Sequence, residues 1–124
     1  MITKMKNTRI LIVDDDLIFG KNFATILIDK GYSVELAGTG NKAVDMLNSG
    51  DFNIVLLDIR LPDINGIEVF KKIKQIKPDI SVIVMSAYPY EETVMHTIKE
   101  ESLVYFCKPF DINAVLEAIK KIAG

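Results

Sequence analysis

The chain has 124 residues, of which 49% are hydrophobic and 26% charged, and this describes one globular domain rather than a disordered or fibrous chain. With 15 Lys and Arg against 17 Asp and Glu, the net charge is −2, which argues against a protein that coats nucleic acid. The single cysteine, Cys107, excludes an internal disulfide framework and fits a reducing compartment.

The sequence contains no candidate membrane span or export signal. Its longest apolar runs, at residues 10–13 and 54–57, are strand-length and far shorter than the ~20 residues that cross a bilayer. The lysines in residues 1–9 precede too short an apolar run for a signal peptide. We therefore expect a cytoplasmic protein that makes no membrane contact.

The first half of the chain alternates between strand and helix patterns. Residues 10–13 form a continuous aliphatic run and predict a buried strand. The apolar residues that follow recur at helical spacing, and Gly31 is placed to end that helix from its C′ position. Next come a predicted strand at 33–37, a helix at 42–48 and a second apolar strand at 54–57.

The second half continues the same alternation. A loop rich in turn-forming residues leads into a predicted helix that extends to Lys77. A third apolar strand is predicted at 80–85, followed by a helix at 91–99 and a last strand at 104–107. Asp111 is expected to cap the final helix.

Strands that are apolar throughout must be covered on both faces, as in parallel sheets flanked by helices. The sequence therefore predicts an α/β fold, a single doubly wound five-stranded parallel sheet with five flanking helices and right-handed crossovers. For five strands, the common strand order is the flavodoxin-like 2-1-3-4-5. One domain is expected to fill residues 1–124.

Polar residues follow the predicted strands at the points where they end. These residues are Asp14, Asp15, Asp58, Ser86 and Lys108. In open parallel sheets, ligands bind beyond the carboxyl ends of the strands, where the strand order reverses. In the predicted order the first and third strands are neighbours ~4.8 Å apart, so the three aspartates should share one pocket.

Three carboxylates so close together repel one another unless a cation or bound protons compensate their negative charge. An all-oxygen cluster without His or Cys favours Mg²⁺, with Mn²⁺ an expected substitute. Lys108 and Ser86 would bring a positive charge and a hydroxyl donor, both of which suit phosphoryl oxygens. Together these groups indicate a phosphoryl-transfer site in which an aspartate is the acceptor.

These residues give the chain a family resemblance. It closely resembles the receiver domain of two-component response regulators from residue 9 to about residue 123, and its Lys-Pro-Phe-Asp-Ile ending is similar to that of small relay-type receivers. The matching motifs are the acidic run at 10–16, Leu56-Leu57-Asp58 followed by Leu61-Pro62 and Gly66, the hydroxyl segment at 85–88, and Phe106-Cys107-Lys108-Pro109-Phe110.

The resemblance implies a role for each site residue. Asp58 would accept a phosphoryl group from a phosphohistidine, and Lys108 and Ser86 would contact that group. The metal ligands would be Asp15, Asp14 directly or through water, Asp58, and the backbone carbonyl of Arg60. Tyr105 would be an aromatic switch, changing the surface formed by the fourth helix, fifth strand and fifth helix. The Lys108–Pro109 bond would be cis, which for X-Pro costs only ~0.5–1 kcal/mol.

The implied partners are a histidine kinase or a histidine phosphotransfer protein, and a downstream protein or output domain that the sequence does not identify. We expect no direct nucleic-acid binding by this domain. By family position, Arg60 and Tyr88 would cover the phosphoryl group and lengthen its lifetime.

Leu17, Ile18 and Phe19 are consecutive at the start of the first predicted helix and span about 200° of its circumference. They cannot all face one core stripe, so at least one should be exposed beside the site. Exposed apolar groups next to a reactive centre suggest that these three residues form a docking surface.

Two other functions are alternatives to a receiver domain. A Mg²⁺-dependent phosphatase with an aspartyl-phosphate intermediate is the main alternative, although it would need a cap domain or longer loops. An FMN-binding protein would need a phosphate loop where this chain is anionic. Asp16 is as good a candidate for a helix cap as for a part of the acidic site. His96 is expected to be a solvated surface residue rather than a ligand or phosphocarrier, and Cys107 a small core residue.

Overall fold

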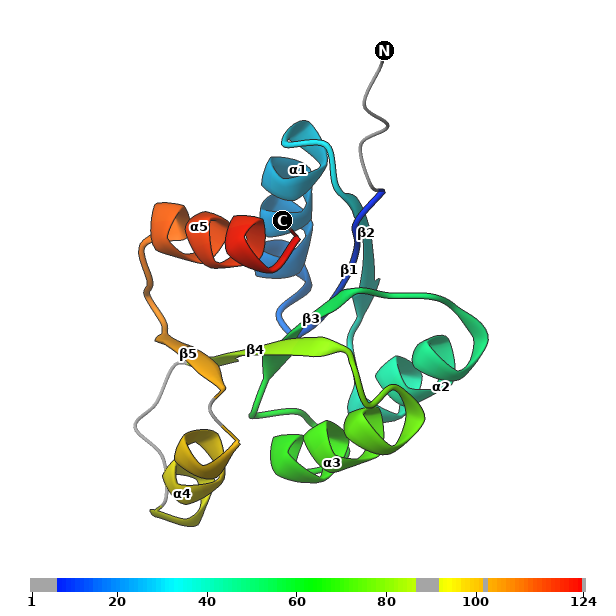
Figure 1. Ribbon diagram of the computed structural model, residues 1–124, viewed down its shortest axis with the longest axis vertical. Helices are drawn as coiled ribbons and strands as arrows, with labels where there is room; N and C mark the ends of the chain where they lie inside the picture. Colours follow the sequence, from blue (N-terminus) through cyan, green and yellow to red (C-terminus); the bar gives the residue numbers. More distant parts are fainter. Residues whose placement is uncertain (1–6, 87–91, 102, 124) are drawn as a thin grey trace.

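The computed structural model describes residues 7–86, 92–101 and 103–123 (Figure 1). Strands and helices alternate along the chain, as predicted, with element ends shifted by one or two residues from the sequence-based boundaries. The elements are β1 (Arg9–Val13), α1 (Leu17–Asp29), β2 (Ser33–Ala37), α2 (Gly40–Ser49), β3 (Ile54–Asp58), α3 (Gly66–Ile76), β4 (Ser81–Ser86), α4 (Glu92–Glu100), β5 (Val104–Cys107) and α5 (Ile112–Ala123).

All neighbouring strands are parallel, and their order is β2-β1-β3-β4-β5, which confirms the flavodoxin-like topology. The register of β1 against β3 pairs Val13 with Leu57. Asp14 directly follows β1 and Asp58 is the last residue of β3, so the pairing brings their side chains to one edge of the sheet.

The sheet is covered on both faces (Figure 1). Helices α1 and α5 pack against one face, over a core that includes Ile12, Leu56 and Met85. Helices α2, α3 and α4 pack against the other face, over a core that includes Leu11, Val55 and Val84. Because alternate residues of each central strand enter opposite cores, these strands are apolar throughout, as the sequence indicated.

The helix ends follow local sequence signals. Asp16 caps α1 by accepting a hydrogen bond from the N–H of Phe19 at 3.0 Å, and Asn65 caps α3 through the N–H of Ile67 at 2.8 Å. Gly31 ends α1 with a φ of +99°, a conformation that favours glycine. Among the helices in the described ranges, none has both the length and the apolar composition needed to cross a membrane.

Two predictions about surface residues have different outcomes. The expectation that Cys107 is a core residue is wrong, because its side chain is exposed at the end of β5. Strand β5 lies at the edge of the sheet with a single strand neighbour, so it is less covered than β1, β3 and β4. His96 is exposed, as predicted, and its Nε2 lies 2.8 Å from Oε2 of Glu100, one turn later in α4.

Candidate functional site

The three aspartates lie together at the carboxyl edge of the sheet. One carboxylate oxygen from each of Asp14, Asp15 and Asp58 lies within 4.8 Å of the others. Asp14 and Asp58 are buried, with only 3% and 7% of their surfaces exposed, whereas Asp15 is exposed. The predicted acidic pocket is therefore present, and its open side is lined by Asp15.

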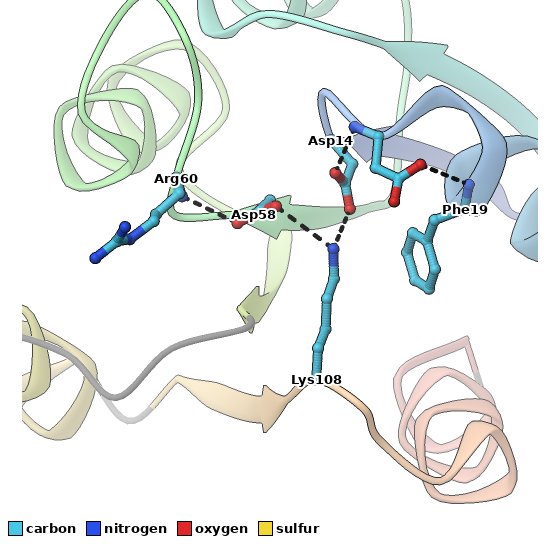
Figure 2. Close-up of polar contacts among 6 residues, drawn as sticks. Asp14, Phe19, Asp58, Arg60 and Lys108 are labelled. Atoms are coloured by element: carbon cyan, nitrogen blue, oxygen red, sulfur yellow. Dashed lines mark hydrogen bonds and ion pairs between the residues drawn. The ribbon is translucent and has the colours of Figure 1, made fainter.

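Lys108 reaches this pocket from the end of β5. Its Nζ donates to Asp14 Oδ2 at 2.5 Å and lies 3.5 Å from Asp58 Oδ2 (Figure 2). The following bond, Lys108–Pro109, is cis, as the family resemblance implied. An ammonium group placed between two carboxylates is suited to contact an anion that joins the pocket.

Backbone N–H groups orient the two buried carboxylates. The N–H of Asp16 donates to Asp14 Oδ1 at 2.9 Å, and the N–H of Arg60 donates to Asp58 Oδ1 at 2.9 Å (Figure 2). Both bonds run from the second residue beyond the aspartate, in the turn that follows the strand. In each residue the Oδ2 atom is therefore the one that faces Lys108.

The charged groups of the site, Asp14, Asp58 and Lys108, are largely shielded from solvent. The pKa of Asp58 is raised from 3.8 to about 6, mainly by burial and also by the carboxylate of Asp14, against the lowering effects of the Arg60 N–H and Lys108. Burial alone would lower the pKa of Lys108, but its contacts with Asp14 and Asp58 outweigh burial and raise it. The Lys108 ammonium is thus charged at neutral pH. Its positive charge does not fully offset the effects of burial and of the Asp14 carboxylate on Asp58.

Ser86 and Tyr105 lie on the neighbouring strands β4 and β5. Ser86 is fully buried at the end of β4, where its carbonyl oxygen accepts a hydrogen bond from the N–H of Lys108 at 2.5 Å. Tyr105 is half-buried and packs against the core that α2, α3 and α4 cover. Ser86 is thus close to Lys108 along the same sheet edge, and Tyr105 borders the side of the molecule that carries α4.

Arg60 and Tyr88 are the two residues predicted to shield the phosphoryl group. Arg60 is exposed, and its side chain points away from the Asp58 carboxylate (Figure 2). Its backbone, in contrast, faces the site through the N–H bond to Asp58. Tyr88 lies outside the described residues.

The first turn of α1 divides into two parts. Leu17 and Ile18 are exposed over 53% and 76% of their surfaces, which confirms that this turn presents apolar groups to solvent. Phe19 is half-buried instead, and its ring faces the Lys108 ammonium with 4.3 Å between Nζ and the ring centroid. The apolar surface beside the site is therefore made by Leu17 and Ile18, with Phe19 turned inward.

The acidic pocket fits a hard divalent cation such as Mg²⁺. It offers carboxylate oxygens from three residues, two of them buried. The pKa of Asp58 is raised mainly by burial and also by the Asp14 carboxylate, and a bound cation would offset both effects. The clustered ligands contain no nitrogen or sulfur donor, which disfavours zinc.

Comparison with known proteins bears directly on this geometry. Residues 10–120 match the response regulator receiver domain family. The chain belongs to this family. Receiver domains accept a phosphoryl group on an aspartate with Mg²⁺, and their partners are histidine kinases or phosphotransfer proteins.

Similar proteins include both single-domain and longer regulators. Sporulation initiation phosphotransferase F of Bacillus subtilis is 35% identical over 117 residues, which cover 94% of this chain and 94% of that protein. The transcriptional regulatory protein ZraR of Escherichia coli is also 35% identical, but the chain spans only 26% of its length. The response regulator TrrA of Thermotoga maritima, solved with Mg²⁺ and BeF, is 30% identical with a TM-score of 0.81, covering 93% of this chain and 98% of that one.

Two features of this receiver domain were not predicted from sequence. One is the contact between Phe19 and Lys108, which come from α1 and from the end of β5. The other is a contact of Asp63, which lies in the loop between β3 and α3. Its carboxylate binds the first N–H groups of α2, more than 20 residues earlier in the chain. Neither contact has a local sequence signal, because each joins segments that meet only in the folded domain.

Proposed function

We propose that this receiver domain is a phosphorylation-switched signalling module of the cytoplasm in which Asp58 is the phosphoacceptor. The observation that carries the proposal is the convergence of Asp14, Asp15, Asp58 and Lys108 at one edge of the sheet. Asp14 and Asp58 are the two buried aspartates of the three. Lys108 holds Asp14 in the shorter ion pair, at 2.5 Å, whereas the Asp58 oxygen lies 3.5 Å from Lys108 and is held less tightly.

The chemistry follows from the positions of the two Asp58 oxygens. Oδ1 is held by the Arg60 N–H, so Oδ2 attacks the phosphorus of a phosphohistidine. The new P–O bond forms as the P–N bond breaks, and the imidazole leaves with its electron pair and takes up a proton. Lys108 and the hydroxyl of Ser86 then contact oxygens of the transferred group.

Asp14, Asp15, Asp58 and the Arg60 carbonyl would hold Mg²⁺, with Mn²⁺ as a substitute. The bound cation would supply positive charge against the three carboxylates and the incoming phosphoryl group. Two backbone N–H groups orient the buried carboxylates: the Asp16 N–H binds Asp14, and the Arg60 N–H binds the acceptor, Asp58.

The output of the switch is a changed α4-β5-α5 surface, read by a downstream protein or output domain. Ser86 would move toward the phosphoryl group, and Tyr105 would rotate into the space beside it. A few charge-assisted hydrogen bonds of ~1.5–3 kcal/mol each suffice to shift a two-state equilibrium without refolding the domain. Unchanged amide chemical shifts around Tyr105 on addition of beryllofluoride and Mg²⁺ would exclude this coupling.

The phosphodonor partner is a histidine kinase or histidine phosphotransfer protein, and the exposed side chains of Leu17 and Ile18 are its proposed contacts. Both residues begin the helix that directly follows the acidic run. An apolar contact there would bring the donor histidine to the open side of the pocket.

The decisive experiment is an intact-mass measurement after incubation with acetyl phosphate and Mg²⁺. The wild type should gain one phosphoryl group, and Asp58→Asn or EDTA should abolish the gain. A phosphatase with an aspartyl-phosphate intermediate would instead release phosphate continuously from an external monoester. Labelling of Asp58→Asn at the wild-type level would refute the assignment of the acceptor.

A further inference from the structure

The aromatic ring of Phe19 lies against the ammonium group at the centre of the site. Lys108 Nζ is 4.3 Å from the ring centroid, and the same atom contacts Asp14 and Asp58 (Figure 2). A cation within about 6 Å of an aromatic face is attracted by the ring quadrupole. The lysine side chain is only 18% exposed, so water screens this attraction less than it would on the surface.

Two neighbouring phenylalanines pack against the ring, and a third extends the cluster. The centroid of Phe19 is 5.7 Å from that of Phe23 in the same helix and 5.8 Å from that of Phe110, which follows β5. Phe110 also contacts Phe23 at 6.0 Å and Phe106 at 6.1 Å. These four rings form an aromatic cluster that joins α1 to the segment carrying Lys108.

The backbone of Phe19 is tied to the same site. Its N–H donates to the Asp16 carboxylate, and the N–H of Asp16 donates to Asp14 Oδ1. Asp14 Oδ2 in turn accepts from Lys108, whose Nζ faces the Phe19 ring. The contacts therefore form a closed ring of interactions that runs from Asp14 through Asp16, Phe19 and Lys108 back to Asp14.

We propose that Phe19 is a positioning residue for Lys108, whose ring face holds the flexible lysine chain with its ammonium within reach of the group bound to Asp58. An aliphatic side chain would fill the same space but would not attract the cation. The effect of Phe19 on phosphorylation rests on the proposed function, whereas its effect on the position of Lys108 does not.

The first measurement is made without any phosphodonor. In the NMR spectrum of protein labelled with ¹³C-lysine, the ring current of Phe19 should displace the Lys108 Hε resonances, assigned with Lys108→Arg, from their ordinary position. Phe19→Leu should return them to it, and Phe19→Tyr should preserve the displacement. Lys108 resonances that are identical in wild type and Phe19→Leu would overturn the positioning role, whatever the protein's function.

The second measurement is the initial rate of phosphorylation by acetyl phosphate and Mg²⁺. Phe19→Leu should slow it about 3- to 30-fold, with Phe19→Tyr near the wild-type rate. In a Lys108→Ala background, Phe19→Leu should cause no further slowing. Phe52→Leu is a matched control, because Phe52 is also buried beneath a cation, Arg9 at 4.8 Å, but lies just before β3, away from the site.

The two measurements separate the hypotheses. A wild type that takes up no label would reject the proposed function, while the lysine resonances would still decide the position of Lys108. Labelling of Phe19→Leu at the wild-type rate, or equal slowing with and without Lys108, would reject the role of Phe19. Slowing by Phe19→Tyr equal to that by Phe19→Leu would show that the site needs only the shape of phenylalanine, and would overturn the proposal as well.

Discussion

Asp63 binds the N-terminus of α2 through Gly40. Its Oδ1 accepts the Gly40 N–H and its Oδ2 the Asn41 N–H, each at 2.9 Å, while Thr39 caps the N–H of Lys42 at 3.1 Å. The loop between β3 and α3, which begins directly after Asp58, is therefore fastened to a second helix. Gly40 itself has no room for a side chain, since a Cβ there would lie 2.6 Å from Ile64 of the same loop.

Asp63→Ala should lower the melting temperature and speed amide exchange at Gly40 and Asn41. The two N–H bonds lower the pKa of Asp63, so its stabilisation is present above the ordinary value of 3.8 and is lost as the pH falls through the lower folded value. The difference in melting temperature between wild type and variant should thus be constant at neutral pH and shrink below pH 3.8. Asp51→Ala, at another exposed carboxylate, is the control for a general charge effect.

Gly66→Ala should destabilise the domain and slow phosphorylation of Asp58. A Cβ at Gly66 would lie 2.4 Å from the Cα of Ile59, so the backbone next to the acceptor would have to move. Overpacking of this kind costs about 1–3 kcal/mol. Gly38→Ala is a matched control, because a Cβ there makes only an ordinary contact of 3.6 Å with Leu17. Urea denaturation of both variants tests the difference, and equal loss of stability would contradict it.

Asp58→Asn should stabilise the protein at neutral pH when EDTA is present. Because the pKa of Asp58 rises from 3.8 to about 6, the folded state binds this proton more tightly than the unfolded state. The free energy of unfolding therefore falls as the pH rises through that interval, and the cost persists above it. The variant should gain about 1–3 kcal/mol at pH 7.5 and close to nothing below pH 3.8. Asp45→Asn, on the exposed face of α2, is the control for removal of one negative charge.

Ile18→Ser should slow phosphotransfer from a protein donor without slowing phosphorylation by acetyl phosphate. Ile18 is 76% exposed and belongs to the proposed docking contacts, whereas a small phosphodonor needs no docking surface. Ile28→Ser is a suitable control, because Ile28 is also exposed, at 55%, but lies at the other end of α1. Equal slowing by the two substitutions would argue against a specific surface.

The lifetime of phospho-Asp58 depends on whether Arg60 can turn back toward the acceptor. Its side chain points away from Asp58 here, so shielding would need a rotation once the phosphoryl group provides an anionic partner (Figure 2). Arg60→Ala should then accelerate loss of the label, and Arg60→Ala with Tyr88→Ala should accelerate it further. Decay of purified phosphoprotein, followed by intact mass, measures both rates. Unchanged decay in the double variant would show that these side chains do not protect the bond.

Much of the fold and of the acidic pocket could be predicted because the relevant signals are local. Apolar strands such as β3 must be covered on both faces, and an aspartate that ends such a strand necessarily lies at the carboxyl edge of a parallel sheet. Asp14 and Asp58 therefore needed only the correct strand order to become neighbours. The caps by Asp16 and Asn65 are likewise signals within one turn of chain.

Tertiary packing decided the remaining features. Exposure of Cys107 follows from the place of β5 at the sheet edge, which the residue's own neighbours in sequence do not encode. The inward turn of Phe19 toward Lys108, and the reach of Asp63 to Gly40, join segments that are far apart in the chain. The physical reason is the same in each case: a hydrophobic pattern specifies which face of an element is buried, but side-chain direction depends on which other elements pack against that face.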